Sequence, residues 1–423
     1  MKFKIITLGC KVNTYESNMM REKLIASGFV ETIDDCDILI INTCSVTNMA
    51  DAKSRKLIRY NKRENPNAIT LVCGCSSENH REELLDLGID ILIGNNEKSK
   101  VVELINNYIK DNKKYIKFYN TRRLEFENMH VSKFTNQTRA YIKIQDGCNN
   151  FCAYCIIPYM RGVSRSKDFN LCLDEARQLV ENGHKEIVLT GIDTGSYGKD
   201  IGSSLTSLLK EMVKIDGLER IRLSSIDIDD LDDDFINFYK HDKMCDHLHI
   251  SLQSGSDKIL KLMLRRYDCA YFLDKINKIR EVKPNVNITT DVIVGFPCED
   301  DKDFNDTLKY CKKVSFSKIH VFPYSKRNGT KAAIMKNQVS GDIKKDRVNK
   351  LIELSNKLQY EYNKLYLNKI VDVLIEEVNG NISIGHTTNY LKVIINSKLK
   401  ENEIVKVKIN KIDIEEVYGE YQL

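Results

Sequence analysis

The sequence predicts an α/β protein with an N-terminal small parallel α/β sheet domain, a central partial (β/α)6 barrel and a C-terminal small antiparallel β-barrel. Strand-like apolar runs alternate with helical segments through the first 110 residues, and again from Ala140 to Phe322. From Asn368 onward, β-branched residues alternate with polar ones between turn signals, which predicts the final barrel. The 423 residues are also too many for one ordinary domain. The expected boundaries are 1–112, 113–137 as a linker, 138–367 and 368–423.

In the N-terminal part, chemistry is expected in the loops at the carboxyl ends of the parallel strands. Cys10, Cys44 and Cys75 each follow one of the first three expected strands, so we expect them to converge as a three-cysteine site. The alternative is that they are small loop residues, since Cys36 and Cys73 show that the chain uses cysteine freely. The expected strands are Phe3–Leu8, Asp37–Asn42, Ala68–Cys73 and Ile89–Ile93, and the expected helices are Asn13–Ser27, Asp51–Asn61 and Glu78–Leu87.

The central part is predicted from six strand-then-helix units, the first strand being Ala140–Ile144. Active residues of such barrels lie in the loops that follow the strands. The later strands are expected at Glu186–Leu189, Arg220–Leu223, His247–Leu252, Asn287–Val294 and Lys318–Phe322. The helices are expected at Leu173–Asn182, Leu205–Val213, Lys258–Leu264, Phe272–Val282 and Phe304–Lys313.

Cys148, Cys152 and Cys155 form a C-x3-C-x2-C triplet just after the first of these strands. Three thiolates on one short loop can hold three corners of a [4Fe-4S] cluster, and the fourth iron is then free to bind S-adenosylmethionine for reductive cleavage. A structural zinc site would require a second ligand pair, and none lies near this loop. Buried structural thiols are the other alternative, but Gly147 and Asn149 indicate a tight polar loop.

Polar side chains and glycines follow the later strands of the barrel. Gly191 lies in a glycine-rich loop, while Ser225, Gln253 and Asp291 lie at or near the ends of successive strands. Each of these, taken alone, is typical of ordinary turns. Together they outline one pocket, so we predict that they bind the cofactor.

The composition predicts a soluble, reduced, cytoplasmic protein. Thirteen irregularly spaced cysteines argue against a disulfide framework, and neither a signal peptide nor a membrane span is visible. The net charge of +5 does not by itself establish a nucleic-acid partner. The expected helix after Cys44 carries a run of cations that could contact RNA, although such runs are usually solvated surface. These cations are Lys53, Arg55, Lys56, Arg59, Lys62 and Arg63.

In the C-terminal part, strands are expected at Ile370–Ile375, Tyr390–Ile395 and Glu403–Ile409, after a connecting helix over 346–360. From Asn368 onward, seven Lys and Arg residues stand against nine Asp and Glu residues. Bulk charge in this part therefore does not support nonspecific RNA binding.

Several longer motifs carry a family resemblance that spans nearly the whole chain. They are Thr7–Ser17 (TLGCKVNTYES), Ile41–Thr47 (INTCSVT), Gly74–Cys75, the triplet with Ile156–Gly162 (IIPYMRG), Ser164–Arg165, and His320–Thr330 (HVFPYSKRNGT). With these motifs the chain resembles the radical S-adenosylmethionine methylthiotransferases. Within this family, the KVNTYES and HVFPYS runs most closely resemble the branch that acts on N6-threonylcarbamoyladenosine in tRNA.

The resemblance implies an enzyme that adds a methylthio group to C2 of this nucleoside at position 37, next to the anticodon. Cys148, Cys152 and Cys155 would hold the cluster that cleaves S-adenosylmethionine, with Tyr154 beside its adenine, and the other three cysteines a second [4Fe-4S] cluster that carries the sulfur. The implied partners are the tRNA, an electron donor such as flavodoxin or ferredoxin, and a sulfur source, without a membrane. The final barrel would be an RNA-binding TRAM module, with 385–390 as a candidate contact loop.

Two alternatives remain open at this stage. The same chemistry could act on isopentenyladenosine in tRNA or on an aspartate of a ribosomal protein, or the chain could be a noncatalytic iron–sulfur protein that binds RNA or senses a signal. The sequence also departs from the family pattern at Asp193, Ser251 and Cys298. These departures leave the six proposed ligands intact, but they weaken any detailed transfer of cofactor contacts.

Overall fold

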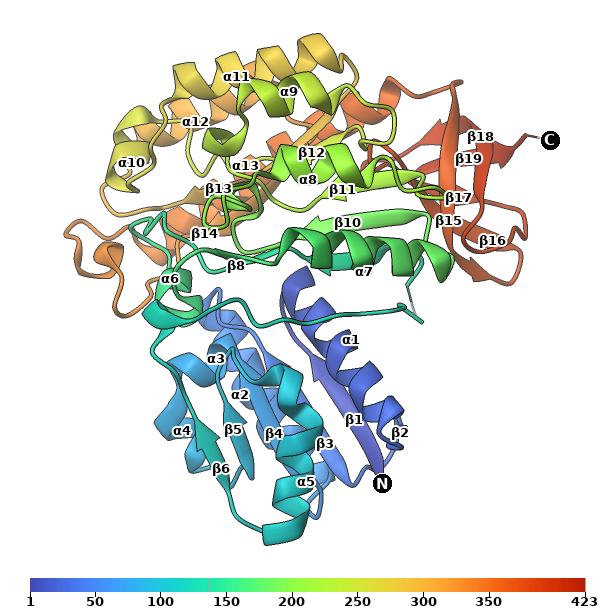
Figure 1. The fold of residues 1–423 in the computed structure, drawn as a ribbon. Coiled ribbons are helices and arrows are strands. Elements are labelled where there is room, and N and C mark those ends of the chain that lie inside the picture. Colours follow the sequence, from blue (N-terminus) through green and yellow to red (C-terminus); the bar gives the residue numbers. More distant parts are fainter. Residues whose placement is uncertain (136, 423) are drawn as a thin grey trace.

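The computed structural model describes residues 1–135 and 137–422, and in it the N-terminal sheet and the central strands contribute to one hydrophobic core. Figure 1 shows the N-terminal part below the central part, with the C-terminal barrel on one side of the latter. Asn136, in the expected linker, and Leu423, at the end of the expected final barrel, lie outside the described residues. The predicted α/β class with its three parts is confirmed. No helix of the described chain has the length and apolar character needed to cross a membrane.

The N-terminal sheet has six parallel strands in the order β2-β1-β3-β4-β5-β6. Strand β3 is apolar from Ile38 to Ile41 because both faces are covered: Ile38 and Ile40 pack with helices α1 and α5, and Leu39 and Ile41 pack with α2 and α4. The strands are β1 (Lys2–Thr7), β2 (Val30–Glu31), β3 (Ile38–Thr43), β4 (Ile69–Gly74), β5 (Ile91–Ile93) and β6 (Tyr115–Lys117). The helices are α1 (Lys11–Ala26), α2 (Asn48–Glu64), α3 (Cys75–Asn79), α4 (Arg81–Leu85) and α5 (Val101–Asp111).

The segment 113–137, expected to be a linker, contributes strand β6 to this sheet. Tyr115 pairs with Ile91 of β5, and the Tyr115 hydroxyl donates a hydrogen bond to Glu97 at 2.8 Å. A three-residue strand at the edge of a sheet has too little alternation to be found by a hydrophobic pattern. The same reason explains why the two-residue strand β2 was not predicted.

The central part is an open barrel built from two three-stranded parallel sheets, β11-β10-β7 and β12-β13-β14. Isolated bridges such as Ile226 to Ile250 join the sheets between β11 and β12. The strands are β7 (Ala140–Lys143), β10 (Glu186–Thr190), β11 (Arg220–Leu223), β12 (His247–His249), β13 (Asn287–Val294) and β14 (Lys318–Pro323), with the small pair β8 (Gln145–Asp146) and β9 (Arg165–Ser166). The helices are α6 (Ile157–Arg161), α7 (Phe169–Glu181), α8 (Leu205–Met212), α9 (Asp233–Tyr239), α10 (Asp257–Leu262), α11 (Cys269–Val282), α12 (Asp301–Val314) and α13 (Gly341–Lys364).

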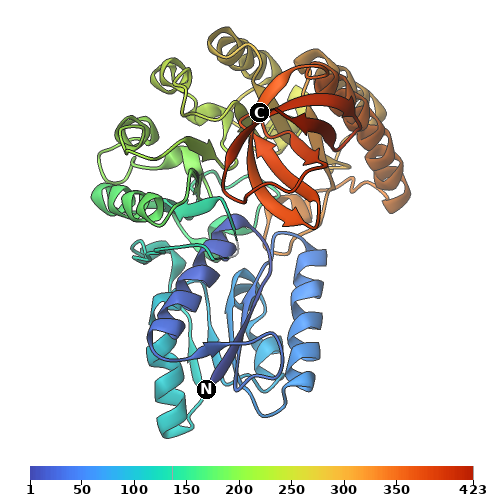
Figure 2. The same cartoon turned by 90° about the vertical axis from the view of Figure 1, so that its right-hand side faces the viewer.

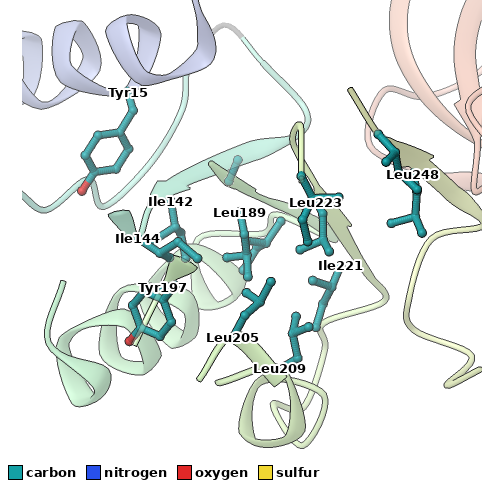
Figure 3. Close-up of a cluster of buried hydrophobic side chains, with 14 of the residues drawn as sticks. Tyr15, Ile142, Ile144, Leu189, Tyr197, Leu205, Leu209, Ile221, Leu223 and Leu248 are labelled. Carbon is teal, nitrogen blue, oxygen red and sulfur yellow. The ribbon is translucent and has the colours of Figure 1, made fainter. Parts of the chain in front are cut away.

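The barrel strands and α8 bury a layer of aliphatic side chains, shown in Figure 3. Tyr15 of α1 belongs to the same cluster, and its hydroxyl donates a hydrogen bond to Glu175 of α7 at 2.8 Å. Tyr15 and Glu175 are both fully buried. The first helix of the N-terminal part is therefore fixed against the central barrel, which in turn fixes the position of the Cys10 loop that precedes this helix.

The C-terminal part is a closed five-stranded barrel, β15-β16-β17-β19-β18, in which β17 and β19 run parallel. Figure 2 shows it docked beside the central part. Arg220 and Arg222 of β11 donate hydrogen bonds to four of its backbone carbonyls at 3.0–3.1 Å. The strands are β15 (Ile370–Asn379), β16 (Ile382–Thr387), β17 (Lys392–Ile395), β18 (Ile404–Ile412) and β19 (Val417–Tyr421).

Candidate active site

The first candidate centre is the loop between β8 and α6, which carries Cys148, Cys152 and Cys155. The loop is closed by backbone hydrogen bonds, including one from the Cys148 amide to Gly162 at 3.0 Å. Gly147 has a φ of 72°, and a side chain there would collide with the carbonyl of Val163. The glycine therefore allows the loop to turn tightly enough to bring the three cysteines together.

The three thiols of this loop influence one another. Burial, followed by the neighbouring Cys152 thiol, raises the pKa of Cys155 to about 12. Burial and then the Asp193 carboxylate raise the pKa of Cys148, and Cys155 and Cys152 add to the rise. Thiols with raised pKa values remain protonated until a metal binds them. The loop thus supplies three sulfur ligands that must lose protons on binding, as iron–sulfur ligation requires.

A cation faces this centre. Arg265 donates from Nη1 to the sulfur of Cys152 at 3.2 Å and from Nη2 to Asp227 at 2.5 Å. The guanidinium thus places a charged hydrogen-bond donor beside a sulfur of this centre. Among the described residues, no three His, Cys, Asp or Glu side chains are placed to hold a single metal ion. The fit to a cluster therefore rests on the thiol set and on the cation beside it.

The second set of cysteines also converges, at the carboxyl edge of the N-terminal sheet. Cys10 precedes α1, Cys44 follows β3 and Cys75 begins α3, so all three follow the neighbouring strands β1, β3 and β4. Burial raises the pKa of Cys44 to about 11, and Cys75 and Cys10 contribute to the rise. A Cβ atom on Gly9 would lie 2.9 Å from the Cys44 sulfur, so only glycine allows this close approach of the two loops.

Arg161 connects the two cysteine sets, a role that was not predicted. It lies at the end of α6, just after the first cysteine loop, and its side chain is fully buried. It donates from Nε to the Cys75 sulfur at 3.3 Å, from Nη2 to Asn13 at 2.8 Å and from Nη1 to Glu16 at 3.1 Å and to Asp146 at 3.2 Å. The only sequence signal was its place in the IIPYMRG motif.

Glu16 is the acidic centre of this network. Its buried carboxylate also accepts from Lys143 at 2.8 Å and pairs with Lys98. Burial opposes ionisation of Glu16, but Arg161, Lys143 and Lys98 together lower its pKa. The network therefore holds a fixed set of charges between the two cysteine centres.

Two adjoining cavities extend from these centres. The smaller, of about 190 Å³, is lined by Tyr154 and Cys155 of the first loop and by Val46 and Thr47, which follow Cys44. The larger, of about 570 Å³, lies among the inward faces of β11 to β14 and the C-terminal barrel. Asp291 and Phe322 line both cavities.

The predicted cofactor-binding residues divide between these spaces. Gln253 lines the smaller cavity with Tyr154, Ser225 lines the larger one, and Asp291 lines both. Gly191 lines neither, but lies against the side chain of Gln145, which leaves no room for a Cβ atom. The structure thus brings four of the five residues to the cavities, and their contacts with a cofactor stay predictions.

The three departures from the family pattern lie in different surroundings. The Asp193 carboxyl lies 3.5 Å from the Cys148 sulfur, and burial together with Asp230 and Asp227 raises its pKa to about 7. Ser251 lies 3.5 Å from Asp291, at the wall of the cavities. Cys298 occupies a left-handed turn with a φ of 68°, where glycine is the favoured residue.

The two candidate RNA contacts differ in accessibility. The loop 385–390 faces inward: the Tyr390 ring is stacked between His247 and His386, with centroid distances of 4.9 Å, and the Asn389 carbonyl accepts from Asn287 at 2.6 Å. This loop docks the C-terminal barrel, but its half-buried His386 and Tyr390 side chains line the larger cavity, so RNA contact by the loop stays a prediction. Four cations of α2 are exposed, whereas Arg55 pairs with Glu83, so RNA contact by this helix stays a prediction. The exposed cations are Lys53, Lys56, Arg59 and Arg63.

Two family models match the chain: the radical SAM superfamily over residues 142–311, and an uncharacterized protein family, UPF0004, over residues 2–94. The threonylcarbamoyladenosine tRNA methylthiotransferase MtaB of Bacillus subtilis is 41% identical, over 96% of this chain and 93% of the relative. The Thermotoga maritima protein of the same name is 39% identical over 96% and 94%. A tRNA-2-methylthio-N(6)-dimethylallyladenosine synthase of Clostridium tetani is 38% identical over 97% and 94%.

Among solved structures, the radical S-adenosylmethionine methyltransferase TsrM from Kitasatospora setae has a similar fold. The TM-score is 0.56 with 12% sequence identity, over 79% of this chain and 77% of the other. At this identity the likeness concerns the fold alone.

Proposed function

The chain belongs to the radical S-adenosylmethionine methylthiotransferases, and on this basis we propose that it adds a methylthio group to C2 of N6-threonylcarbamoyladenosine at position 37 of tRNA. The family implies a [4Fe-4S] cluster and S-adenosylmethionine. The proposal includes a second [4Fe-4S] cluster, an electron donor such as flavodoxin or ferredoxin, and a sulfur source. Since its substrate is tRNA, we expect the protein in the cytoplasm.

The observation that carries this proposal is that a cysteine of the first set and residues next to the second set line two adjoining cavities. Cys155 and the residues that follow Cys44 line one cavity, and Lys11, which follows Cys10, lines the other. Insertion of sulfur at an unactivated carbon needs a radical source and a sulfur source at the same atom of the substrate. One cysteine of the first set and chain neighbours of two cysteines of the second set line adjoining cavities, which places both sets close to one substrate space.

The lining of the larger cavity favours a polar substituent on the adenine. His249, His320 and Asp291 face this space, and the His249 and Asp291 side chains are 3.1 Å apart. The isopentenyl group of the alternative tRNA substrate is apolar, so it would displace water from these partly exposed polar groups without offering a hydrogen bond in return, which is unfavourable. The threonylcarbamoyl group carries a hydroxyl, a urea and a carboxylate that could bind them.

The two cysteine sets would have separate tasks in this reaction. Cys148, Cys152 and Cys155 would hold one cluster, and Cys10, Cys44 and Cys75 the other. When bound, the clusters and S-adenosylmethionine supply a 5′-deoxyadenosyl radical and a methylated sulfur for replacement of the C2 hydrogen.

The residues around the thiols hold this arrangement in place. Arg265 donates a hydrogen bond to Cys152 of the first set, and Arg161 donates one to Cys75 of the second. Ile156, Ile293 and Phe322 give the smaller cavity apolar walls, which reduce the contact of a reactive radical with water.

Nucleoside analysis of tRNA from a strain that lacks the gene tests the proposal. We expect the 2-methylthio form of threonylcarbamoyladenosine to be absent and to return with the wild-type gene, but not with a Cys44→Ala variant. The methylthio form of isopentenyladenosine in the same tRNA pool is the control and should not change. Persistence of the first nucleoside in a strain without a paralogue, or loss of the second alone, would contradict the proposal.

A further inference from the structure

The larger cavity contains one cation whose charge is not balanced by a neighbouring acid. Lys11 lies at the start of α1 and is half-buried, and its side chain lines the cavity. Within the described residues, no carboxylate oxygen lies within 4.0 Å of its ammonium group, and this group makes no hydrogen bond. A partly buried ammonium without partners has lost part of its hydration, so an anion that enters the cavity would be bound favourably.

The other lysines and arginines of the cavity are already paired. Arg222 donates to Glu186 at 2.6 Å. Lys392 pairs with Glu416 at 2.6 Å, and Lys318 with Glu415 at 3.6 Å. Their charges are therefore compensated by the protein itself, and Lys11 is the cation of this space that is available to a ligand.

The position of Lys11 relates it to the reacting carbon. It directly follows Cys10, so its backbone is part of the second cysteine centre while its side chain reaches into the larger cavity. Asp291 and Phe322 join this cavity to the smaller one, which borders Cys155. An adenine placed between the two centres can therefore direct a substituent toward Lys11.

We propose that Lys11 binds the carboxylate of the threonylcarbamoyl group and thereby selects this substrate over adenosines with neutral substituents. The inference rests on the proposed function and assigns a recognition residue to it. A charge-assisted hydrogen bond in a partly buried site is stronger than a neutral one. It also discriminates strongly, because a substrate without the anion leaves the ammonium unpaired.

The test uses two anticodon stem-loop RNAs that differ in one group. One carries N6-threonylcarbamoyladenosine at position 37, and the other carries the same nucleoside with its carboxylate converted to a primary amide. Methylthiolation by the reconstituted enzyme is measured as kcat/KM for each RNA, and fluorescence anisotropy gives the Kd without turnover. We expect the wild type to prefer the carboxylate RNA roughly ten- to a hundredfold, as expected for one charge-assisted contact.

Three variants separate recognition from folding. In Lys11→Met the preference should fall to about one, through a loss on the carboxylate RNA, whereas Lys11→Arg should retain most of the preference because it keeps the charge. Lys210→Met makes the same chemical change at a cation outside both cavities, which pairs with Asp234 at 2.8 Å, and should behave as the wild type. The iron content of each variant shows whether the neighbouring cysteine centre has assembled.

Several outcomes would overturn this assignment. A Lys11→Met enzyme that keeps the preference shows that another group reads the carboxylate. An equal loss on both RNAs shows that Lys11 binds an RNA phosphate or supports Cys10 instead. If the wild-type enzyme modifies both RNAs equally, the role of Lys11 is refuted but the proposed function is not. If it modifies neither RNA, the proposed function is refuted as well.

Discussion

The guanidinium of Arg161 donates a hydrogen bond from Nε to the sulfur of Cys75 at 3.3 Å. Arg161 belongs to the helix after the first cysteine loop, and Cys75 to the second cysteine set, so this contact joins the two centres directly. Its other nitrogens bind Glu16, Asp146 and Asn13. The relative position of the two centres therefore depends on the buried side chain of Arg161, whose charge is neutralised by Glu16 and Asp146.

Replacement of Arg161 by Met should destabilise the protein by about 3 kcal/mol or more, because it leaves Glu16 and Asp146 buried with one fewer cation. Arg161→Lys keeps the charge and should lose less stability. Chemical denaturation of the metal-free protein measures both effects. Equal stability of the Met variant and the wild type would show that Lys143 and Lys98 alone neutralise the acids.

The two cysteine sets should be separable by iron content. The wild type should bind about eight irons, the number in two cubane clusters. Cys148→Ala should bind about four and lose formation of 5′-deoxyadenosine, whereas Cys44→Ala should bind about four and keep it. Cys36→Ala is a matched control, because this cysteine lies outside both sets. About four irons in the wild type would contradict the two-cluster proposal.

Much of the fold could be predicted because its elements have clear periodicity. The buried strand at Ile38–Thr43 begins with a run of four apolar residues, and β10, β11, β13 and β14 lie where the strand-then-helix pattern placed them. Strands β2 and β6 were not predicted because they have only two and three residues, respectively. Their identity depends on pairing with neighbours, which a local pattern does not contain.

The site could be predicted only in part, where the position of a residue follows from the order of the strands. Cysteines at strand ends can be located from topology, so the convergence of Cys10, Cys44 and Cys75 was expected. The contacts of Arg161 and of Lys11 join segments that are distant in the chain, and only the packing of the parts reveals them. The inward position of Tyr390 is a further example, since the loop 385–390 resembles an exposed turn until the C-terminal barrel is docked.

Tyr390 should control the docking of the C-terminal barrel. Its ring is stacked between two histidines and lies over Arg222, 4.7 Å from its guanidinium carbon, while its φ of 67° is costly for a residue with a side chain. Tyr390→Ala should cost about 3 kcal/mol from loss of the stacked ring. Tyr390→Gly loses the same ring but relieves the backbone, so it should be about 1 kcal/mol more stable than the Ala variant.

Denaturation of the three proteins gives this order, and limited proteolysis reports whether the barrel detaches. Tyr390→Phe is the control that keeps both stacking contacts, and it should stay close to the wild type. A Gly variant less stable than the Ala variant would show that the left-handed backbone is not a significant cost at this position.

The stability of the same interface should depend on pH through His247. This imidazole is buried against the Tyr390 ring, and burial together with Arg222, His249, Lys11 and His320 lowers its pKa well below the ordinary value. The folded state therefore keeps His247 neutral, while the unfolded chain takes up a proton below about pH 6.5. Since the unfolded state then binds more protons, stability is full above this pH and falls as the pH decreases.

For this single proton, the decrease in the free energy of unfolding approaches about 1.4 kcal/mol per pH unit below pH 6.5. His247→Gln should remove that part of the slope, so its stability should fall less than that of the wild type between pH 7.5 and pH 5.5. Melting temperatures over this range measure the difference, with the exposed residue His130→Gln as a control that should follow the wild type. Parallel curves for the wild type and His247→Gln would show that His247 takes up its proton without opening the interface, and would assign the acid sensitivity to other groups.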